Sequence, residues 1–278
     1  MDVGIGLPNT IPGTDGRLVV EWARRADQGP FSTLGVLDRL AYDAIDPFAA
    51  LSAAAGVTER VGLATMIAIG PLRNTALLAR QAASVDALSG KRLTLGLAVG
   101  ARLDDYETAE VDHRGRGARL SEQLAALRDG GGAEESGRGL GVREDLRVLV
   151  GGMVGPAFAR MARYADGYAH NGGPPRAFER AAASARAAWS DLGRPGQPLL
   201  WGQGYFALGE EDQGEAYLKD YYAFTGPFAE KIAAGNLTSP RAIRDFVRGY
   251  EEAGCDELIL FPTVADLTQL DRLAEALA

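Results

Sequence analysis

The chain has 278 residues, 46% of them hydrophobic and 24% charged, so a large apolar core can form without disulfides or metals. Its formal net charge of -8 repels nucleic-acid phosphates and anionic membrane surfaces, so we expect neither as a partner. The single cysteine excludes an internal disulfide, and two histidines are too few for a multi-histidine metal site. Because the start does not resemble a signal peptide and no run of 18 apolar residues occurs, we expect a cytoplasmic protein.

In the first half of the chain, four short apolar runs are each followed by a segment with helical spacing. The runs are residues 3–7, 33–37, 61–66 and 93–99. The helical segments are residues 17–28, a segment that begins at 46–47, residues 74–88 and residues 117–128. Asp46 followed by Pro47 is typical of a helix start, and Ser89 followed by Gly90 is typical of a helix end.

The second half repeats this alternation. Its apolar runs are residues 146–150, 166–170, 199–207 and 257–261. The helical segments are residues 157–165, 177–192, 212–224, 241–253 and 265–278. Residues 129–139 are rich in Gly and predict a flexible connector between the two halves.

Eight strand–helix units in this length predict an α/β fold, a (β/α)₈ TIM barrel, as a single domain over residues 1–278. The alternative is an open doubly wound sheet, whose first strand normally leads into a Gly-rich phosphate turn. Here Gly4 and Gly6 lie inside the first run, and Pro8 and Asn9 follow it. The sequence therefore favours the closed barrel.

In such a barrel, functional side chains lie on the loops that leave the C-terminal ends of the strands. Asp38 follows the second run and could accept a hydrogen bond from a ligand or move a proton; the alternatives are an ion pair with Arg39 or a role like that of a helix N-cap. His170 could act as an acid or base, or could contact solvent or a phosphate. Tyr and Phe residues are frequent in residues 205–224. We expect most of them to lie in the core or in a subunit contact, and a minority to line a substrate pocket.

Paired glycines follow two consecutive runs. Gly151 and Gly152, followed by Met153, end the fifth run, and Asn171, Gly172 and Gly173 end the sixth. Backbone N–H groups beside a helix start bind anions, so the two turns could hold one phosphate. The alternative is that these glycines only permit tight turns, and the nearest cation in the sequence is Arg176. We expect Gly151→Asp and Gly172→Asp each to abolish binding of a phosphate-bearing cofactor.

Residues 81–100, QAASVDALSGKRLTLGLAVG, resemble the "LDxLSGGRLxLGVGxG" segment of the luciferase-like monooxygenase family. Weaker similarities occur in the family's order at residues 58–65, 71–74, 104–107, 150–152 and 163–168. The resemblance implies a barrel that binds FMN or coenzyme F420, a small organic substrate, and a homodimer as is common in the family. It places Asp38 beside the cofactor ring, with a slight preference for F420.

The resemblance also assigns roles at the other strand ends. Thr65 and Met66 occupy the end of the third strand, where many members have a non-prolyl cis peptide bond that supports the cofactor ring. Gly100 is implied to let the fourth strand approach the ring closely. The residues implied at the phosphate end are Gly151, Gly152, Met153, Asn171, Gly172 and Gly173.

The sequence departs from the family at several positions. Arg39 follows Asp38 where many members have acid–histidine pairs, Thr75 replaces a usual proline, and Ala98 replaces a usual glycine. The family's proton donors therefore do not transfer.

The leading function is a flavin- or deazaflavin-dependent oxidoreductase or monooxygenase, with Asp38 and His170 as candidate catalytic groups. The alternatives are a cofactor-binding barrel without turnover, or an unrelated barrel enzyme with a phosphorylated substrate. We expect Asp38→Ala to lower activity more than stability.

Overall fold

The computed structural model describes residues 1–129 and 141–278, and its eight parallel strands close into one barrel in sequence order. The strands are β1 (Asp2–Gly6), β2 (Thr33–Val36), β3 (Gly62–Ile69), β4 (Leu93–Ala98), β5 (Arg147–Gly151), β6 (Gly167–Ala169), β7 (Leu199–Phe206) and β8 (Glu257–Pro262). Closure is made by β1 pairing with β8, where Val3 lies opposite Leu258. The predicted (β/α)₈ barrel is confirmed.

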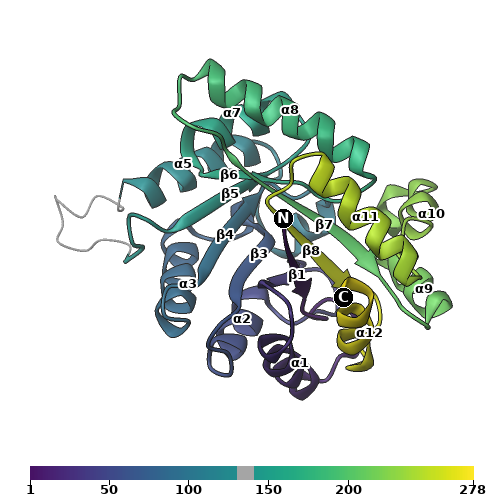
Figure 1. Cartoon of the computed structure of the whole chain (residues 1–278). Coiled ribbons are helices and arrows are strands. Elements are labelled where there is room, and N and C mark those ends of the chain that lie inside the picture. The colour runs from purple at the N-terminus through teal and green to yellow at the C-terminus, as the bar shows by residue number, and fades with distance from the viewer. Residues whose placement is uncertain (130–140) are drawn as a thin grey trace.

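Helices surround the strands on the outside of the barrel (Figure 1). They are α1 (Gly16–Gln28), α2 (Pro47–Ala55), α3 (Thr75–Leu88), α4 (Leu103–Thr108), α5 (Arg116–Arg128), α7 (Gly155–Tyr164), α8 (Pro175–Asp191), α9 (Glu211–Tyr221), α10 (Phe228–Ala233), α11 (Pro240–Glu252) and α12 (Thr268–Leu277), with 3₁₀ turns η1 (Gly70–Leu72) and η2 (Ala223–Thr225). In the described ranges, no helix is both long enough and apolar enough to cross a membrane.

The predicted segments match the observed ones within a few residues, but the short helices α4 and α10 were not predicted. Each has only six residues, which is less than two turns and too short to show a helical period. Both belong to loops at the C-terminal ends of strands, so the missed helices are the ones nearest to the expected site. The predicted connector lies outside the described residues, apart from Asp129.

Local capping explains where the outer helices start. The Asp46 carboxylate accepts hydrogen bonds from the N–H groups of Phe48 and Ala49, as its position before Pro47 predicts. Asn74 caps α3 and Ser239 caps α11 in the same way. These side chains satisfy N–H groups that the first helical turn leaves free.

Glycines on the first two strands make room for large side chains of β8 inside the barrel. A Cβ atom at Gly6 would collide with the ring of Phe261, and one at Gly35 would lie 2.7 Å from Ile259 Cγ2. Both β8 side chains are fully buried. The glycines of the first apolar run therefore serve core packing in a closed barrel, and not a phosphate turn.

Candidate functional site

A cavity of about 750 Å³ opens at the C-terminal ends of the strands. Seven residues that the sequence singled out line it: Asp38, Met66, Gly100, Met153, Asn171, Gly172 and Gly173. Segments separated by more than 100 residues therefore meet at one rim, as the barrel topology requires. Thr65, Gly151, Gly152 and His170 are not among the lining residues that the structure describes.

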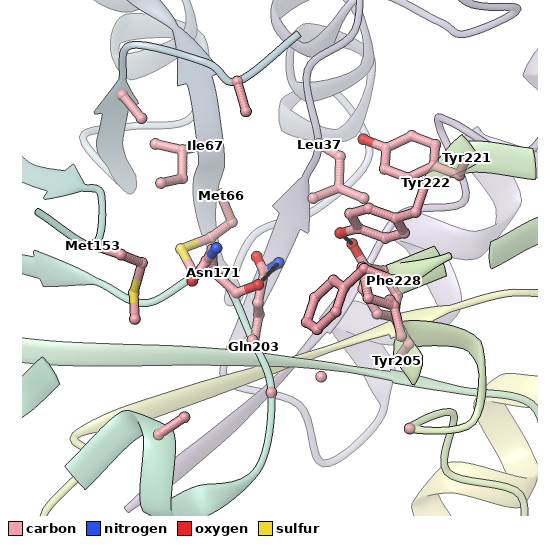
Figure 2. A pocket seen from close by; sticks show the side chains of 18 of the residues that line it. Leu37, Met66, Ile67, Met153, Asn171, Gln203, Tyr205, Tyr221, Tyr222 and Phe228 are labelled. Carbon is pink, nitrogen blue, oxygen red and sulfur yellow. Dashed lines mark hydrogen bonds between the residues drawn. The ribbon is translucent and has the colours of Figure 1, made fainter. Parts of the chain in front are cut away.

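The cavity has two chemically different sides (Figure 2). Met66, Ile67 and Met153 lie on one side, with Asn171 beside them. Tyr205, Tyr221, Tyr222 and Phe228 gather on the other side. One side is therefore formed by strand ends, and the other by aromatic residues of β7, α9 and α10.

Asp38 is held in a buried ion pair. Its carboxylate accepts hydrogen bonds from both terminal nitrogens of Arg73, at 2.5 and 3.1 Å, and from the Ile69 N–H at 2.7 Å. The alternative partner expected from the sequence, Arg39, was wrong, because Arg39 points to another loop. Burial raises the pKa of the Asp38 carboxyl, and the ion pair with Arg73 opposes that rise. Arg73 also contacts Asp46, which extends the ion pair to the start of α2.

Arg39 instead connects the loop after β2 to α4. Its guanidinium lies 2.9 Å from Asp104 and 3.0 Å from Asp105, and its side chain is buried. The Asp105 carboxylate also accepts the N–H groups of Leu40 and Ala41, at 2.9 and 2.8 Å. The acidic stretch after the fourth strand thus fixes the loop that carries Asp38.

The end of β3 lies against the cavity, as the resemblance implies, but with a shift of one residue. The cis peptide joins Met66 to Ile67, one position after Thr65–Met66. Thr65 is fully buried, and its hydroxyl bonds to the carbonyl and the N–H of Gly96 on β4. Met66 and Ile67 therefore face the cavity, while Thr65 ties β3 to β4.

The first glycine pair lies behind the cavity surface. A Cβ atom at Gly151 would collide with Ile67 Cδ1, and one at Gly152 would lie 2.7 Å from Ala157 Cβ. From this turn only Met153 lines the cavity. A Gly151→Asp variant would therefore disturb packing whether or not a phosphate binds there.

The second glycine pair lines the cavity directly. Gly172 and Gly173 have φ values of +92° and +106°, which side chains rarely adopt. The adjacent Gln203 is 4% exposed and donates from Nε2 to the Asn171 carbonyl at 3.2 Å. Its Oε1 atom is buried without a hydrogen-bond partner among the described residues. This corner therefore offers backbone N–H groups and one unused acceptor to a ligand.

His170 does not join this group. Its ring is fully buried next to Tyr168, Phe178 and Tyr250, with centroid distances of 6.2, 5.6 and 6.5 Å. Neither ring nitrogen has a hydrogen-bond partner within residues 1–129 and 141–278. Burial lowers its pKa to about 4. The expected contact with solvent was wrong, and the ring is not placed to exchange protons with a ligand in the cavity.

The aromatic region contributes more to the cavity than the sequence indicated. Four of its residues, Tyr205, Tyr221, Tyr222 and Phe224, line the wall. The hydroxyls of Tyr205 and Tyr222 are 2.6 Å apart, which Figure 2 marks by a dashed line. Burial raises the pKa of both phenols, so they stay protonated as donors at neutral pH.

Sequence reasoning assigned no role to two cations of the cavity, Arg102 and Lys231. Arg102 begins the unpredicted helix α4 as its N-cap, and Lys231 lies on the unpredicted helix α10. Arg176, the nearest cation in sequence to the second glycine pair, is not among the described lining residues. The signal for Arg102 was its place at the end of a strand; nothing in the local sequence marked Lys231.

A family model described as luciferase-like monooxygenase matches residues 1–253. An uncharacterised protein of Mycobacterium tuberculosis is 27% identical over 215 residues, which are 65% of this chain and 74% of that protein.

Two solved structures have the same fold over nearly the whole chain. An F420-dependent secondary alcohol dehydrogenase, in complex with an F420-acetone adduct, superposes with a TM-score of 0.79 at 14% identity, covering 99% of this chain and 97% of that one. The oxygenating constituent of 3,6-diketocamphane monooxygenase from Pseudomonas putida, in complex with FMN, superposes with a TM-score of 0.71 at 14% identity, covering 100% and 96%.

Proposed function

Because this chain belongs to the luciferase-like monooxygenase family, we propose that it is an oxidoreductase that binds a flavin or deazaflavin at the C-terminal rim of the barrel and acts on a small organic substrate. The observation that carries the proposal is the 750 Å³ cavity, where seven residues singled out from the sequence converge. Family membership removes the alternative of an unrelated barrel enzyme.

The residues present fit such a cofactor. The unused Oε1 of Gln203 is a buried acceptor, and the pyrimidine end of a flavin or deazaflavin ring carries an N–H donor. Helices α7 and α8, which follow the two glycine turns, begin without a side-chain cap, unlike α2 and α3. Pro174 and Pro175 at the start of α8 have no N–H, and the Ala177 N–H donates to the Pro174 carbonyl at 2.8 Å, so a phosphate at the second turn would bind to the N–H groups of Gly172 and Gly173. Met66 and Ile67 would support the ring on the strand side.

When bound, the cofactor supplies hydride transfer, or with FMN the activation of O₂. The protein positions the ring and excludes water. The neutral phenols of Tyr205 and Tyr222 are available to donate a hydrogen bond on the aromatic side. We favour F420 slightly, because Asp38 at the end of the second strand is more typical of deazaflavin members.

The test is to produce the protein in a host that supplies both cofactors. We expect a flavin or deazaflavin absorption band to remain after desalting, and mass spectrometry of the released compound to identify it. Turnover of small alcohols, ketones and aldehydes with the identified cofactor then separates an enzyme from a carrier. A protein that retains neither compound, and binds neither in a titration, would contradict the proposal.

Changing Gly172 to Asp should weaken cofactor binding by roughly tenfold or more, because a carboxylate next to a phosphate costs more than about 1 kcal/mol. Fluorescence titration of the apoprotein gives the dissociation constant directly.

Two variants separate charge from backbone strain. Gly172→Ala places a side chain at the same positive φ without adding a charge. Gly196→Asp adds the charge at a glycine with φ +69°, where a Cβ would meet no atom within 4 Å. Equal affinity of Gly172→Asp and Gly172→Ala would show that no phosphate lies at this turn.

A further inference from the structure

Arg102 is a buried arginine without an acidic partner. It is 8% exposed, and it forms no ion pair with a carboxylate of residues 1–129 or 141–278. Its Nη2 donates to the Tyr221 carbonyl at 2.6 Å, while Nε is buried without a hydrogen-bond partner in the described chain. A buried guanidinium with unused donors is costly unless an anion completes it.

The cation lies within the aromatic side of the cavity. The guanidinium carbon is 4.2 Å from the ring centre of Tyr221, 4.5 Å from that of Phe224 and 5.5 Å from that of Tyr222. Stacking on these rings fixes the plane of the guanidinium and stabilises its charge. Of these rings, Tyr221 and Tyr222 lie in the wall opposite Met66, Ile67 and Met153 (Figure 2).

Among the described residues, two cations that line the cavity have no carboxylate partner, although the chain carries -8. Its two lining acids are each held in an ion pair, Asp38 with Arg73 and Asp105 with Arg39. Its two lining cations, Arg102 and Lys231, form no ion pair within the described residues. An anion that enters the cavity is therefore attracted to these cations and is not repelled by a free carboxylate.

We propose that Arg102 binds the carboxylate of a ring-containing organic acid, so that the substrate of the proposed oxidoreductase is such an acid. That the bound acid is a substrate rests on the proposed function, whereas the carboxylate-binding site itself does not. The cofactor's phosphate is assigned to the glycine turn after β6, which lines the cavity. Arg102 follows β4 and packs on α9 and η2, on the aromatic side. The substrate ring packs on Tyr221, Tyr222 and Phe224, and the carboxylate accepts from the free guanidinium N–H groups.

The test uses 2-naphthoate and its neutral amide, 2-naphthamide, titrated calorimetrically into the protein with and without its bound cofactor. We expect the wild-type protein to prefer the carboxylate. In Arg102→Met, affinity for 2-naphthoate should fall by roughly tenfold or more, while affinity for 2-naphthamide stays unchanged. Arg102→Lys keeps the charge but not the fork of donors, and should retain part of the preference.

Arg194→Met is the matched control. Arg194 also stacks on an aromatic ring, 3.7 Å from the centre of Trp189, and also donates to backbone carbonyls, those of Ala162 and Ala165, but it does not line the cavity. This variant should lose stability and keep the wild-type preference for the carboxylate.

Several results would overturn the proposal. One is equal wild-type affinity for 2-naphthoate and 2-naphthamide, which needs no variant and no folding control. Another is no measurable binding of 2-naphthoate, benzoate or cyclohexanecarboxylate. A third is an equal loss of cofactor affinity in Arg102→Met, which would assign Arg102 to the cofactor's own anion. If the protein binds neither FMN nor F420 but the carboxylate preference depends on Arg102, the proposed function fails and the anion site stands.

Discussion

Replacing Asp38 with Ala should lower the free energy of unfolding by about 3–5 kcal/mol, because it leaves Arg73 buried without its main partner. The Asp38 side chain is 2% exposed and that of Arg73 is 12% exposed, so solvent replaces little of the lost interaction. The Ile69 N–H loses its acceptor as well. Urea denaturation of the apoprotein measures the change.

The sequence alone led us to expect a larger effect on activity than on stability, whereas the buried ion pair leads us to expect a large loss of stability as well. The double variant Asp38→Ala, Arg73→Met removes both charges and should recover a large part of the loss, since an isolated buried charge costs more than an absent pair. A loss below about 1 kcal/mol in Asp38→Ala, the size of a surface ion pair, would show that the Asp38–Arg73 contact is not a buried structural pair.

Acid should destabilise the protein through His170. The unfolded chain takes up a proton at an ordinary histidine pKa of 6.5, whereas burial lowers the pKa of His170 in the fold to about 4. The stability that the neutral ring contributes is therefore complete above pH 6.5 and is lost as the pH falls toward 4. This difference corresponds to about 3 kcal/mol.

The comparison that isolates this effect is the unfolding free energy of wild type and His170→Leu between pH 7.5 and 4. Other groups titrate in the same range, but they contribute equally to both proteins. The neighbouring phenols of Tyr168 and Tyr250 stay neutral, and their hydroxyls donate to Met153 Sδ and the Gly173 carbonyl, away from the histidine. Parallel pH profiles for wild type and His170→Leu would refute the assignment.

His170 also illustrates what local sequence can and cannot predict. The sequence placed it at the end of a strand, but it did not predict the direction of its side chain. Along β6, Tyr168 packs in the outer core, Ala169 packs inside the barrel, and His170 again points outward. Because side chains alternate along a strand, a shift of one residue moves a group from the cavity to the core.

The sequence alone determined the barrel and the rim where the site lies, because both depend on short-range features. Apolar runs, caps such as Asp46 and the alternation of strands and helices are encoded within a few residues. Once the strands are parallel, their C-terminal ends must share one face, which places Asp38, Met66, Gly100 and Gly172 together.

Only the tertiary structure decided the partners of the charged groups. Asp38 and Arg73 are 35 residues apart, Arg39 and Asp105 are 66 apart, and Arg102 and Tyr221 are 119 apart. These pairs form because closing the barrel brings separate loops within reach of long side chains. The local sequence does not show how close two such loops lie in the folded chain. For the same reason, local sequence did not show that Arg102 and Lys231 line the cavity without a carboxylate partner among the described residues.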